Sequence, residues 1–196
     1  MNKMKIKYKL RRPTKSDLKS FHKNKNDKTI AKNMFGPKYP LTLNQAKKDL
    51  NKLILDNKKE NTDIFVIDID GEATGMIGLW EIIPQLKAKI GYFIGKDYRG
   101  KGITTEAIKE IVKYGFKKYK LRRIYGNVKF ENKASARVLE KAGFKLEGIQ
   151  KKNGFKYRKY FQIWKKFQCI ESALCVQIIN SRITNNEYSN ETYNRR

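Results

Sequence analysis

Apolar and polar residues alternate along several stretches of the chain, which predicts a β-sheet built from short strands. The clearest element is a hairpin, because Asp70-Gly71 separates two apolar runs and this dipeptide is typical of a type I′ turn. Asn153-Gly154 predicts a second hairpin near the end of the chain. The predicted strands are residues 8–11, 64–69, 73–82, 87–94, 123–128, 144–151 and 157–166.

Apolar residues spaced three or four apart predict helices between these strands. Residues 43–57 have them on one face, and a longer apolar stripe follows Gly102 and is expected to cover the sheet. Thr14 is a capping residue at the start of the first helix, and Gly143 ends the last one, over residues 132–142. The fold class is therefore α/β, with a mixed, mostly antiparallel sheet of about seven strands and about four helices.

The length of 196 residues fits one domain with a short extension. Residues 1–166 carry all of the net charge, whereas the last thirty residues are poor in lysine and end in Asn, Ser, Thr and Tyr. We expect a domain over residues 1–166 and a frayed tail over residues 167–196. The chain has neither an apolar run long enough to span a membrane nor a signal-peptide core, so a cytoplasmic protein is expected.

Few residues could carry metal or nucleophilic chemistry. Cys169 and Cys175 match neither a CxxC pair nor a disulfide framework, so no metal site is predicted. His22 is the only histidine, and the sequence offers no nucleophile motif to accompany it, which argues against a hydrolase triad. We expect His22 to lie on the surface of the first helix.

The net charge of +26 indicates an anionic partner, such as a nucleic acid, the ribosome or a polyphosphate cofactor. A genome rich in A and T offers a second explanation, because only ten of the 45 basic residues are arginine.

The most informative local motif is a glycine-rich turn, Arg99-Gly100-Lys101-Gly102-Ile103-Thr104, between a predicted strand and a predicted helix. Two glycines let the backbone approach a ligand closely, and the N–H groups at the start of a helix favour anions. The spacing is neither a Walker motif nor a dinucleotide motif, whose third glycine would fall at Thr105. A tight turn before a helix, without a ligand, is the alternative interpretation.

This turn resembles the acetyl-CoA loop of the GNAT acyltransferase superfamily, and residues 131–144 resemble the second signature of that superfamily. Residues 35–46 and Arg137-Val138-Leu139-Glu140-Lys141 are similar to the RimJ/RimL-like branch, which acetylates N-terminal amines of ribosomal proteins. The resemblance covers about residues 6–160. It implies a GNAT-like sheet that is splayed at the cofactor cleft, with acetyl-CoA as the acyl donor.

The resemblance also implies roles for individual residues. The backbone of Phe93 and Ile94 would bind the pantetheine arm, the backbone N–H groups of residues 99–104 would hold the diphosphate, and the Asn132 amide would reach the pantetheine. Thr104 stands at the last small position of the family loop, where its branched side chain narrows the approach to the phosphates. The expected cofactor-binding residues are Phe93, Ile94, Arg99, Gly100, Lys101, Gly102, Ile103, Thr104 and Asn132.

Two residues are candidate catalysts. Lys89 stands where many relatives have an acidic residue, so Glu81 is the remaining candidate base, with a solvated strand-end carboxylate as the alternative. Leu139 stands where many members have a tyrosine acid, so Ser135 is the candidate acid, with a serine that satisfies a backbone N–H as the alternative. Tyr92 and Tyr125 are expected in the core or the cleft wall.

The leading hypothesis is therefore an acetyl-CoA-dependent N-acetyltransferase that acts on the N-terminal amine of a protein, with a ribosomal protein and a ribosome contact as its specific form. One alternative is an acetyltransferase for a polyamine, an aminoglycoside or an amino acid. Another is a catalytically degenerate basic module that binds the ribosome or RNA. The acceptor amine and the choice between monomer and homodimer stay open at this stage.

Overall fold

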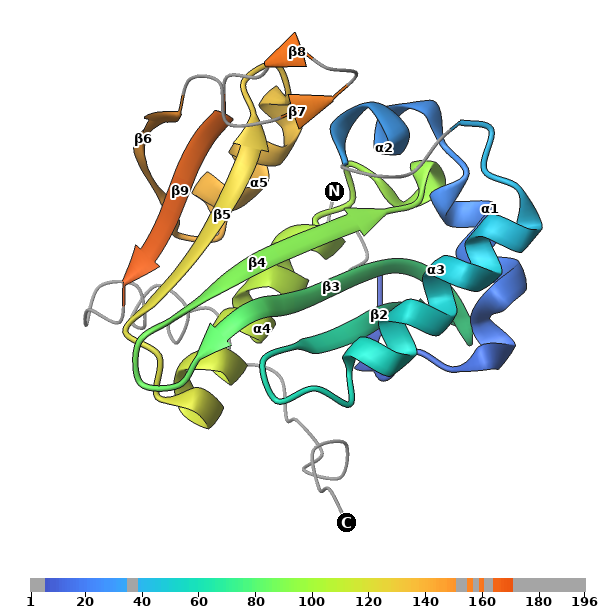
Figure 1. The fold of residues 1–196 in the computed structure, drawn as a ribbon, viewed down its shortest axis with the longest axis horizontal. Helices are drawn as coiled ribbons and strands as arrows, with labels where there is room; N and C mark the ends of the chain where they lie inside the picture. Colours follow the sequence, from blue (N-terminus) through green and yellow to red (C-terminus); the bar gives the residue numbers. More distant parts are fainter. Residues whose placement is uncertain (1–5, 35–38, 151–154, 157–158, 161–163, 171–196) are drawn as a thin grey trace.

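The computed structural model describes residues 6–34, 39–150, 155–156, 159–160 and 164–170 (Figure 1). Their main sheet has the order β1-β2-β3-β4-β5-β9-β6, and its neighbouring strands are antiparallel except for the β4–β5 pair. This confirms the expected mixed, mostly antiparallel sheet. The strands are β1 Lys9–Arg11, β2 Asp63–Ile69, β3 Glu72–Ile83, β4 Lys87–Ile94, β5 Arg123–Lys129, β6 Lys145–Gln150 and β9 Trp164–Ile170, and a separate ribbon pairs β7 Phe155–Lys156 with β8 Lys159–Tyr160.

The described residues contain five α-helices, one more than the sequence predicts. The unexpected one is α2, which is only six residues long and has a single buried residue, Ile30, so it shows no apolar stripe. Its start is marked by Asp27, whose side chain accepts a hydrogen bond from the backbone of Ile30. The helices are α1 Leu18–Lys25, α2 Lys28–Asn33, α3 Leu43–Asp56, α4 Ile103–Tyr119 and α5 Lys133–Lys141, with short 3-10 turns at Lys15–Asp17 and Lys96–Tyr98.

Helices cover both faces of the sheet, and the alternation of side chains along the strands explains how. Met76 and Phe93 face the helices α1 and α3, where they join one apolar cluster with Leu50. Ile77 and Ile94, one residue further along β3 and β4, face α4 and α5 in the larger cluster. The apolar stripe of α4 therefore covers the sheet, as the sequence predicts.

The β2–β3 hairpin turns at the expected dipeptide. Asp70 and Gly71 both have positive φ, 52° and 84°, as a type I′ turn requires. The Asp68 carboxylate accepts a hydrogen bond from the Gly71 N–H and holds the turn from its flank.

The sheet is splayed in its middle, which confirms the opening implied by the family resemblance. β4 and β5 pair only over residues 87–89 and 123–125, and they separate beyond these residues (Figure 1). Past that point β4 remains paired with β3, and β5 remains paired with β9.

The last strand corrects the predicted end of the sheet. The antiparallel partner of β6 is β9, at residues 164–170, whereas the sequence predicts residues 157–166. Phe167 and Cys169 are buried, which explains why the strand continues past residue 166, the expected domain boundary. The predicted turn at Asn153-Gly154 and most of the expected tail, residues 171–196, lie outside the described residues. Among the helices described, none is long and apolar enough to cross a membrane.

Candidate active site

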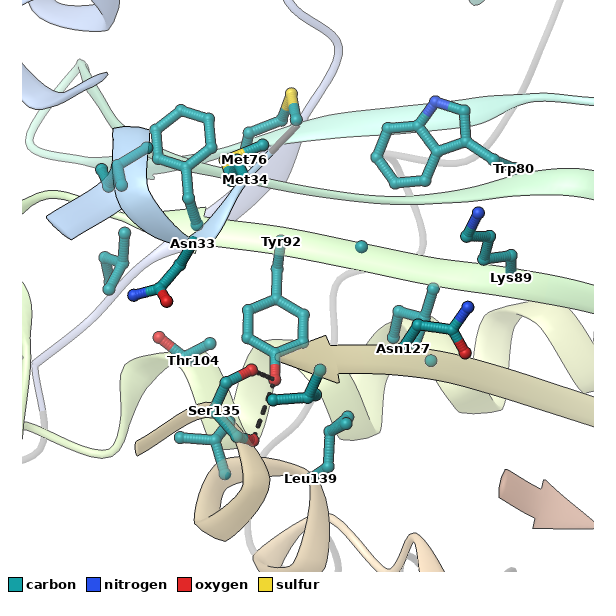
Figure 2. A pocket seen from close by; sticks show the side chains of 18 of the residues that line it. Asn33, Met34, Met76, Trp80, Lys89, Tyr92, Thr104, Asn127, Ser135 and Leu139 are labelled. Atoms are coloured by element: carbon teal, nitrogen blue, oxygen red, sulfur yellow. Dashed lines mark hydrogen bonds between the residues drawn. The ribbon is translucent and has the colours of Figure 1, made fainter. Parts of the chain in front are cut away.

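A cavity of about 870 Å³ lies where β4 and β5 separate. Its walls come from both sides of the sheet (Figure 2). Met76 and Trp80 line it from the side that carries α3, and Tyr92 and Ser135 line it from the side that carries α5. A cavity that passes through a sheet in this way can admit two reactants from opposite faces.

The β4 wall exposes backbone groups to the cavity. Residues 90–94 have no β5 partner, so the alternate N–H and C=O groups that do not bond to β3 face the opening. Phe93 and Ile94 line this stretch, as expected for the residues that would bind a pantetheine arm. A Cβ at Gly91 would lie 3.1 Å from the Trp80 ring, so this glycine leaves the space that the indole occupies.

The glycine-rich turn has the backbone geometry that its sequence suggests. Gly100 and Gly102 have φ of 73° and 81°, and a Cβ on either would meet no atom within 4 Å, so the conformation rather than crowding favours glycine. Gly102 is the N-cap of α4 and has no side chain to satisfy the N–H groups of the first turn. These donors and the helix dipole form an anion-binding terminus.

The loop residues divide into two groups. Arg99, Gly100 and Thr104 are on the cavity wall. Lys101 and Gly102 are exposed outside it, and Ile103, the first residue of α4, is buried in the core.

The Arg99 side chain is held by α2, which the sequence did not reveal. Its Nη2 lies 2.8 Å from Asp27 Oδ1, the same oxygen that caps α2. Burial acts to raise the pKa of Asp27, but the hydrogen bonds from Arg99 and from the helix backbone, with the arginine charge, hold that pKa below its usual value. The loop and α2 are therefore joined through one carboxylate.

Two asparagines supply amide groups at the cavity. Asn132 Oδ1 accepts a hydrogen bond from the Ser135 N–H at 3.2 Å and caps α5, which leaves the Asn132 Nδ2 as the donor for a ligand. Asn127, on β5, lies among the cavity side chains in Figure 2. Its Oδ1 is buried and has no hydrogen-bond partner in the described part of the chain. An unpaired acceptor in this place fits the amide N–H groups of a pantetheine arm.

Ser135 is bonded across the opening to β4. Tyr92 Oη lies 2.7 Å from Ser135 Oγ and 3.2 Å from the Ser135 carbonyl oxygen (Figure 2). Burial raises the pKa of Tyr92 above its usual value, against the effect of the serine hydrogen bond, so the phenol stays protonated. The alternative interpretation of Ser135 as a capping hydroxyl does not match this geometry, because Asn132 provides the cap and the serine hydroxyl pairs with Tyr92.

Glu81 lies at the closed end of the splay, in an irregular segment of β3 with φ of 52°. Its carboxylate accepts hydrogen bonds from Tyr125 Oη at 2.6 Å and from Lys89 Nζ at 3.1 Å. The hydrogen bond from Tyr125 lowers the pKa of Glu81 below its usual value. Partial burial acts to raise it, but the hydrogen bond and the positive charge of Lys89 lower it further. Burial and the Glu81 contact raise the pKa of Tyr125 to about 12. Glu81 is thus ionised at neutral pH, and it is 57% exposed.

The α3 side of the cavity is predominantly basic. Lys52, Lys59 and Lys89 line it together with two carboxylates, those of Asp56 and Glu81. Asp56 is paired with Lys59 at 2.5 Å, and Glu81 is paired with Lys89. Each carboxylate that the structure describes on the cavity wall is therefore already neutralised by a lysine.

Several wall residues were not predicted from the sequence. Thr29 and Asn33 come from α2 and Met34 follows it as the C-cap residue, and the weak apolar pattern of this helix did not predict it. Trp80 could have been found from the period-two series Met76, Gly78 and Trp80, which places it on the face of the cavity. His22 is half-buried, with Nε2 2.7 Å from the Leu41 carbonyl oxygen, and it does not line the cavity.

Comparison with known proteins places this site in a family context. A family model described as an acetyltransferase (GNAT) domain matches residues 7–145. Spermidine N(1)-acetyltransferase of Escherichia coli (strain K12) is 30% identical over 141 residues, which cover 71% of this chain and 74% of that protein. The probable N-acetyltransferase YjcK of Bacillus subtilis (strain 168) is 48% identical over 86 residues, or 43% of this chain, and the matched part spans only 48% of that protein.

A solved structure with the same fold is RimL, described as a ribosomal L7/L12 alpha-N-protein acetyltransferase in complex with coenzyme A. The TM-score is 0.74, and the likeness covers 83% of this chain and 93% of that one. The sequences are 21% identical, so this comparison bears on the fold.

Proposed function

Because the chain belongs to the GNAT acetyltransferase family, we propose that it transfers an acetyl group from acetyl-CoA to the N-terminal amine of a protein. Family membership confirms the expected enzyme class, an acyltransferase, and its acyl donor. The identity of the acceptor is our inference, and the observation that carries it is the charge of the cavity on the α3 side.

The donor half of the site fits acetyl-CoA. The N–H groups at the start of α4 suit the diphosphate, and the open edge of β4 with the unpaired Asn127 oxygen suits the amides of the pantetheine arm. In this arrangement Phe93, Ile94, Gly100, Thr104 and Asn132 contribute to binding from the cavity wall.

The acceptor half argues against a polyamine. A polycation binds best where unpaired carboxylates face it, yet Asp56 and Glu81 are already paired with lysines. Lys52 adds a further positive charge to the same side. A protein N-terminus presents one reactive amine, followed by a neutral backbone and side chains that can be acidic, and this fits the charge distribution.

The two candidate catalysts take the following roles in the proposal. Glu81, as an ionised carboxylate near the acceptor side, accepts the proton that the amine loses, directly or through water. Ser135 donates a hydrogen bond to the thiolate that leaves when the C–S bond breaks. The low basicity of Glu81 makes it a weak base, so positioning of the amine contributes much of the acceleration.

Spermidine is the second candidate acceptor, because the Escherichia coli relative that carries its name is 30% identical over most of this chain. The test is an acetylation assay with acetyl-CoA and three acceptors: a peptide with a free N-terminus and acidic residues behind it, the same peptide with lysines in their place, and spermidine. We expect the acidic peptide to be acetylated fastest, and its N-terminally blocked form to be inert. Preferred acetylation of spermidine would overturn the proposal for the acceptor.

A matched pair of variants tests the charge argument. Lys52→Glu places a carboxylate on the cavity wall, whereas Lys47→Glu changes an exposed lysine of α3 that does not line the cavity. We expect Lys52→Glu to raise KM for the acidic peptide and to lower KM for the basic peptide, while Lys47→Glu leaves the ratio of the two KM values unchanged. Equal effects of both variants would show that net charge, rather than the cavity, selects the acceptor.

The proposal extends to a ribosomal protein as the acceptor, supported by the net charge of +26, which would draw the enzyme toward ribosomal RNA. In that case the rate on assembled ribosomes should fall steeply with salt, whereas the rate on a free peptide should change little. The alternative of an RNA-binding module without activity predicts salt-sensitive RNA binding and no acetyl transfer.

A further inference from the structure

The contact between Tyr92 and Ser135 carries an inference about catalysis, which rests on the proposed function. Tyr92 reaches from β4 to the first turn of α5, across the space where the sheet opens (Figure 2). Its hydroxyl lies 2.7 Å from Ser135 Oγ and 3.2 Å from the Ser135 carbonyl oxygen. Both side chains line the cavity.

The direction of this hydrogen bond follows from what each atom can do. A phenol has one proton, and of the two acceptors within its reach Ser135 Oγ is nearer, at 2.7 Å against 3.2 Å for the Ser135 carbonyl oxygen. The phenol is also a stronger acid than an aliphatic alcohol, which makes it the better donor of the pair. The shorter contact is therefore Tyr92 O–H donating to Ser135 Oγ.

The proton of the serine hydroxyl is then left for another acceptor. With Tyr92 on one lone pair, the serine O–H can point into the cavity. We propose that Tyr92 is a positioning residue, which fixes the Ser135 hydroxyl so that it donates its hydrogen bond to the sulfur of the coenzyme A thiolate.

The chemistry balances without a proton from tyrosine. The nitrogen–carbon bond forms, the carbon–sulfur bond breaks with its electron pair on sulfur, and the amine proton leaves to solvent through the base. Tyr92 keeps its proton throughout, in agreement with the burial that makes its ionisation unfavourable. Ser135 stabilises the thiolate by a hydrogen bond alone.

Without the phenol hydroxyl, Ser135 has another partner. A serine in a helix can donate to a backbone carbonyl three or four residues earlier, which would turn its proton away from the cavity. Tyr92→Phe keeps the ring and its packing while it removes this constraint. We therefore expect Tyr92→Phe to resemble Ser135→Ala in function.

The first experiment measures binding by calorimetry and needs no acceptor. Coenzyme A and desulfo-coenzyme A are compared at about pH 7 and about pH 9, on either side of the usual pKa of a thiol near 8.5. The wild-type protein should favour coenzyme A over desulfo-coenzyme A by about tenfold more at the higher pH, because the thiolate accepts the serine hydrogen bond. Tyr92→Phe and Ser135→Ala should both lose this increase and keep the affinity for desulfo-coenzyme A.

The second experiment measures acetyl transfer. Tyr92→Phe should lower kcat about tenfold with little change in KM for acetyl-CoA, and should have no further effect when Ser135→Ala is present. Tyr8→Phe is the matched control, because it removes a half-buried phenol that bonds to Glu110 away from the cavity.

The outcomes separate the inference from the proposed function. If wild-type protein shows the thiolate preference and Tyr92→Phe retains it, or if Tyr92→Phe lowers kcat further in the Ser135→Ala background, the positioning role is wrong while acetyl transfer stands. If wild-type protein neither binds coenzyme A nor transfers acetyl groups, both are wrong.

Discussion

The Asp27 carboxylate should link the cofactor loop, residues 99–104, to helix α2. One of its oxygens, Oδ1, accepts from Ile30 N at 2.9 Å and from Arg99 Nη2 at 2.8 Å. The six-residue helix α2 has only Ile30 buried, so it depends on this cap and on its neighbours for its position. We predict that substitution of Asp27 changes both stability and acetyl-CoA affinity.

Two substitutions separate the parts of this contact. Asp27→Asn keeps an oxygen that can cap α2 and accept from Arg99, and it removes the charge. The ion pair is partly exposed, with 34% and 16% of the two side chains accessible, so its loss should cost about 0.5–1 kcal/mol. Asp27→Ala also removes the cap, which adds about 1 kcal/mol. For a domain of this size, each 1 kcal/mol lowers Tm by about 2–4 °C.

The charge gives this prediction a pH dependence. The folded-state pKa of Asp27 is lowered, so its ionisation stabilises the fold above the unfolded value of about 3.9, and this stabilisation is lost as the pH falls toward the folded value. The stability difference between wild type and Asp27→Asn should be complete at neutral pH and shrink below about pH 4. Urea unfolding at a series of pH values measures it.

The functional part is tested by calorimetry with acetyl-CoA. Asp27 holds the side chain of Arg99, the first residue of the cofactor loop, so without it acetyl-CoA binding must also order the loop. Asp27→Ala should therefore raise the Kd for acetyl-CoA about fivefold, which corresponds to about 1 kcal/mol of binding free energy. Thr42→Ala is the control, since it removes a side-chain cap of another helix, α3, where Thr42 Oγ1 accepts from Gln45 N at 3.2 Å, and no contact links this exposed residue to the loop among the hydrogen bonds that the structure describes. A Kd that changes equally in both variants, or in neither, would refute the link between α2 and the loop.

Three further predictions follow from single residues. Gly102→Val should raise the Kd for acetyl-CoA about tenfold or more. Gly71→Val is the control at an equally positive φ in the β2–β3 turn: both variants should lower the free energy of unfolding by about 1–2 kcal/mol, but Gly71→Val should leave acetyl-CoA binding intact. Glu81→Gln should lower kcat at all pH values above about 5, because the lowered pKa of Glu81 keeps this carboxylate ionised over that range. A kcat–pH profile of the wild type that falls on the acidic side near neutral pH, with this fall absent in the variant, would contradict the prediction. Asp63→Asn should destabilise the protein by about 3 kcal/mol in urea unfolding with kcat retained, because this fully buried carboxylate accepts hydrogen bonds from two phenols and an ammonium group of the α4 region and pairs with Arg12.

The features predicted correctly from the sequence are those that depend on local backbone chemistry. Asp70-Gly71 specifies its turn because two consecutive residues must adopt positive φ, and the sequence states this through residue type. The same holds for Gly100 and Gly102 before α4. The splay came from the family resemblance, since no local pattern reveals where two neighbouring strands separate, and the strand order came only from the structure.

The features that were missed depend on contacts between distant residues. Asp27 and Arg99 are 72 positions apart, and neither shows by its type or spacing that it binds the other. Tyr92 was expected in the core or the cleft wall, and it lies on the wall, but its hydrogen bond to Ser135 depends on where α5 lies beside β4. The last strand was predicted too early, at residues 157–166, because lysines obscure the alternation of apolar and polar residues there. The buried Phe167 and Cys169 belong to the strand that continues beyond residue 166.

The charge of the chain shows why position matters more than composition for the choice of acceptor. A net charge of +26 repels polycations at long range, but salt screens this repulsion at distances beyond about 10 Å. The charges of the cavity, by contrast, act at contact distance. At contact, the decisive fact is that Lys89 and Lys59 already satisfy Glu81 and Asp56. A polyamine would have to displace these lysines, whereas an acidic peptide meets them directly. The acceptor preference should therefore persist at salt concentrations that abolish any attraction to RNA.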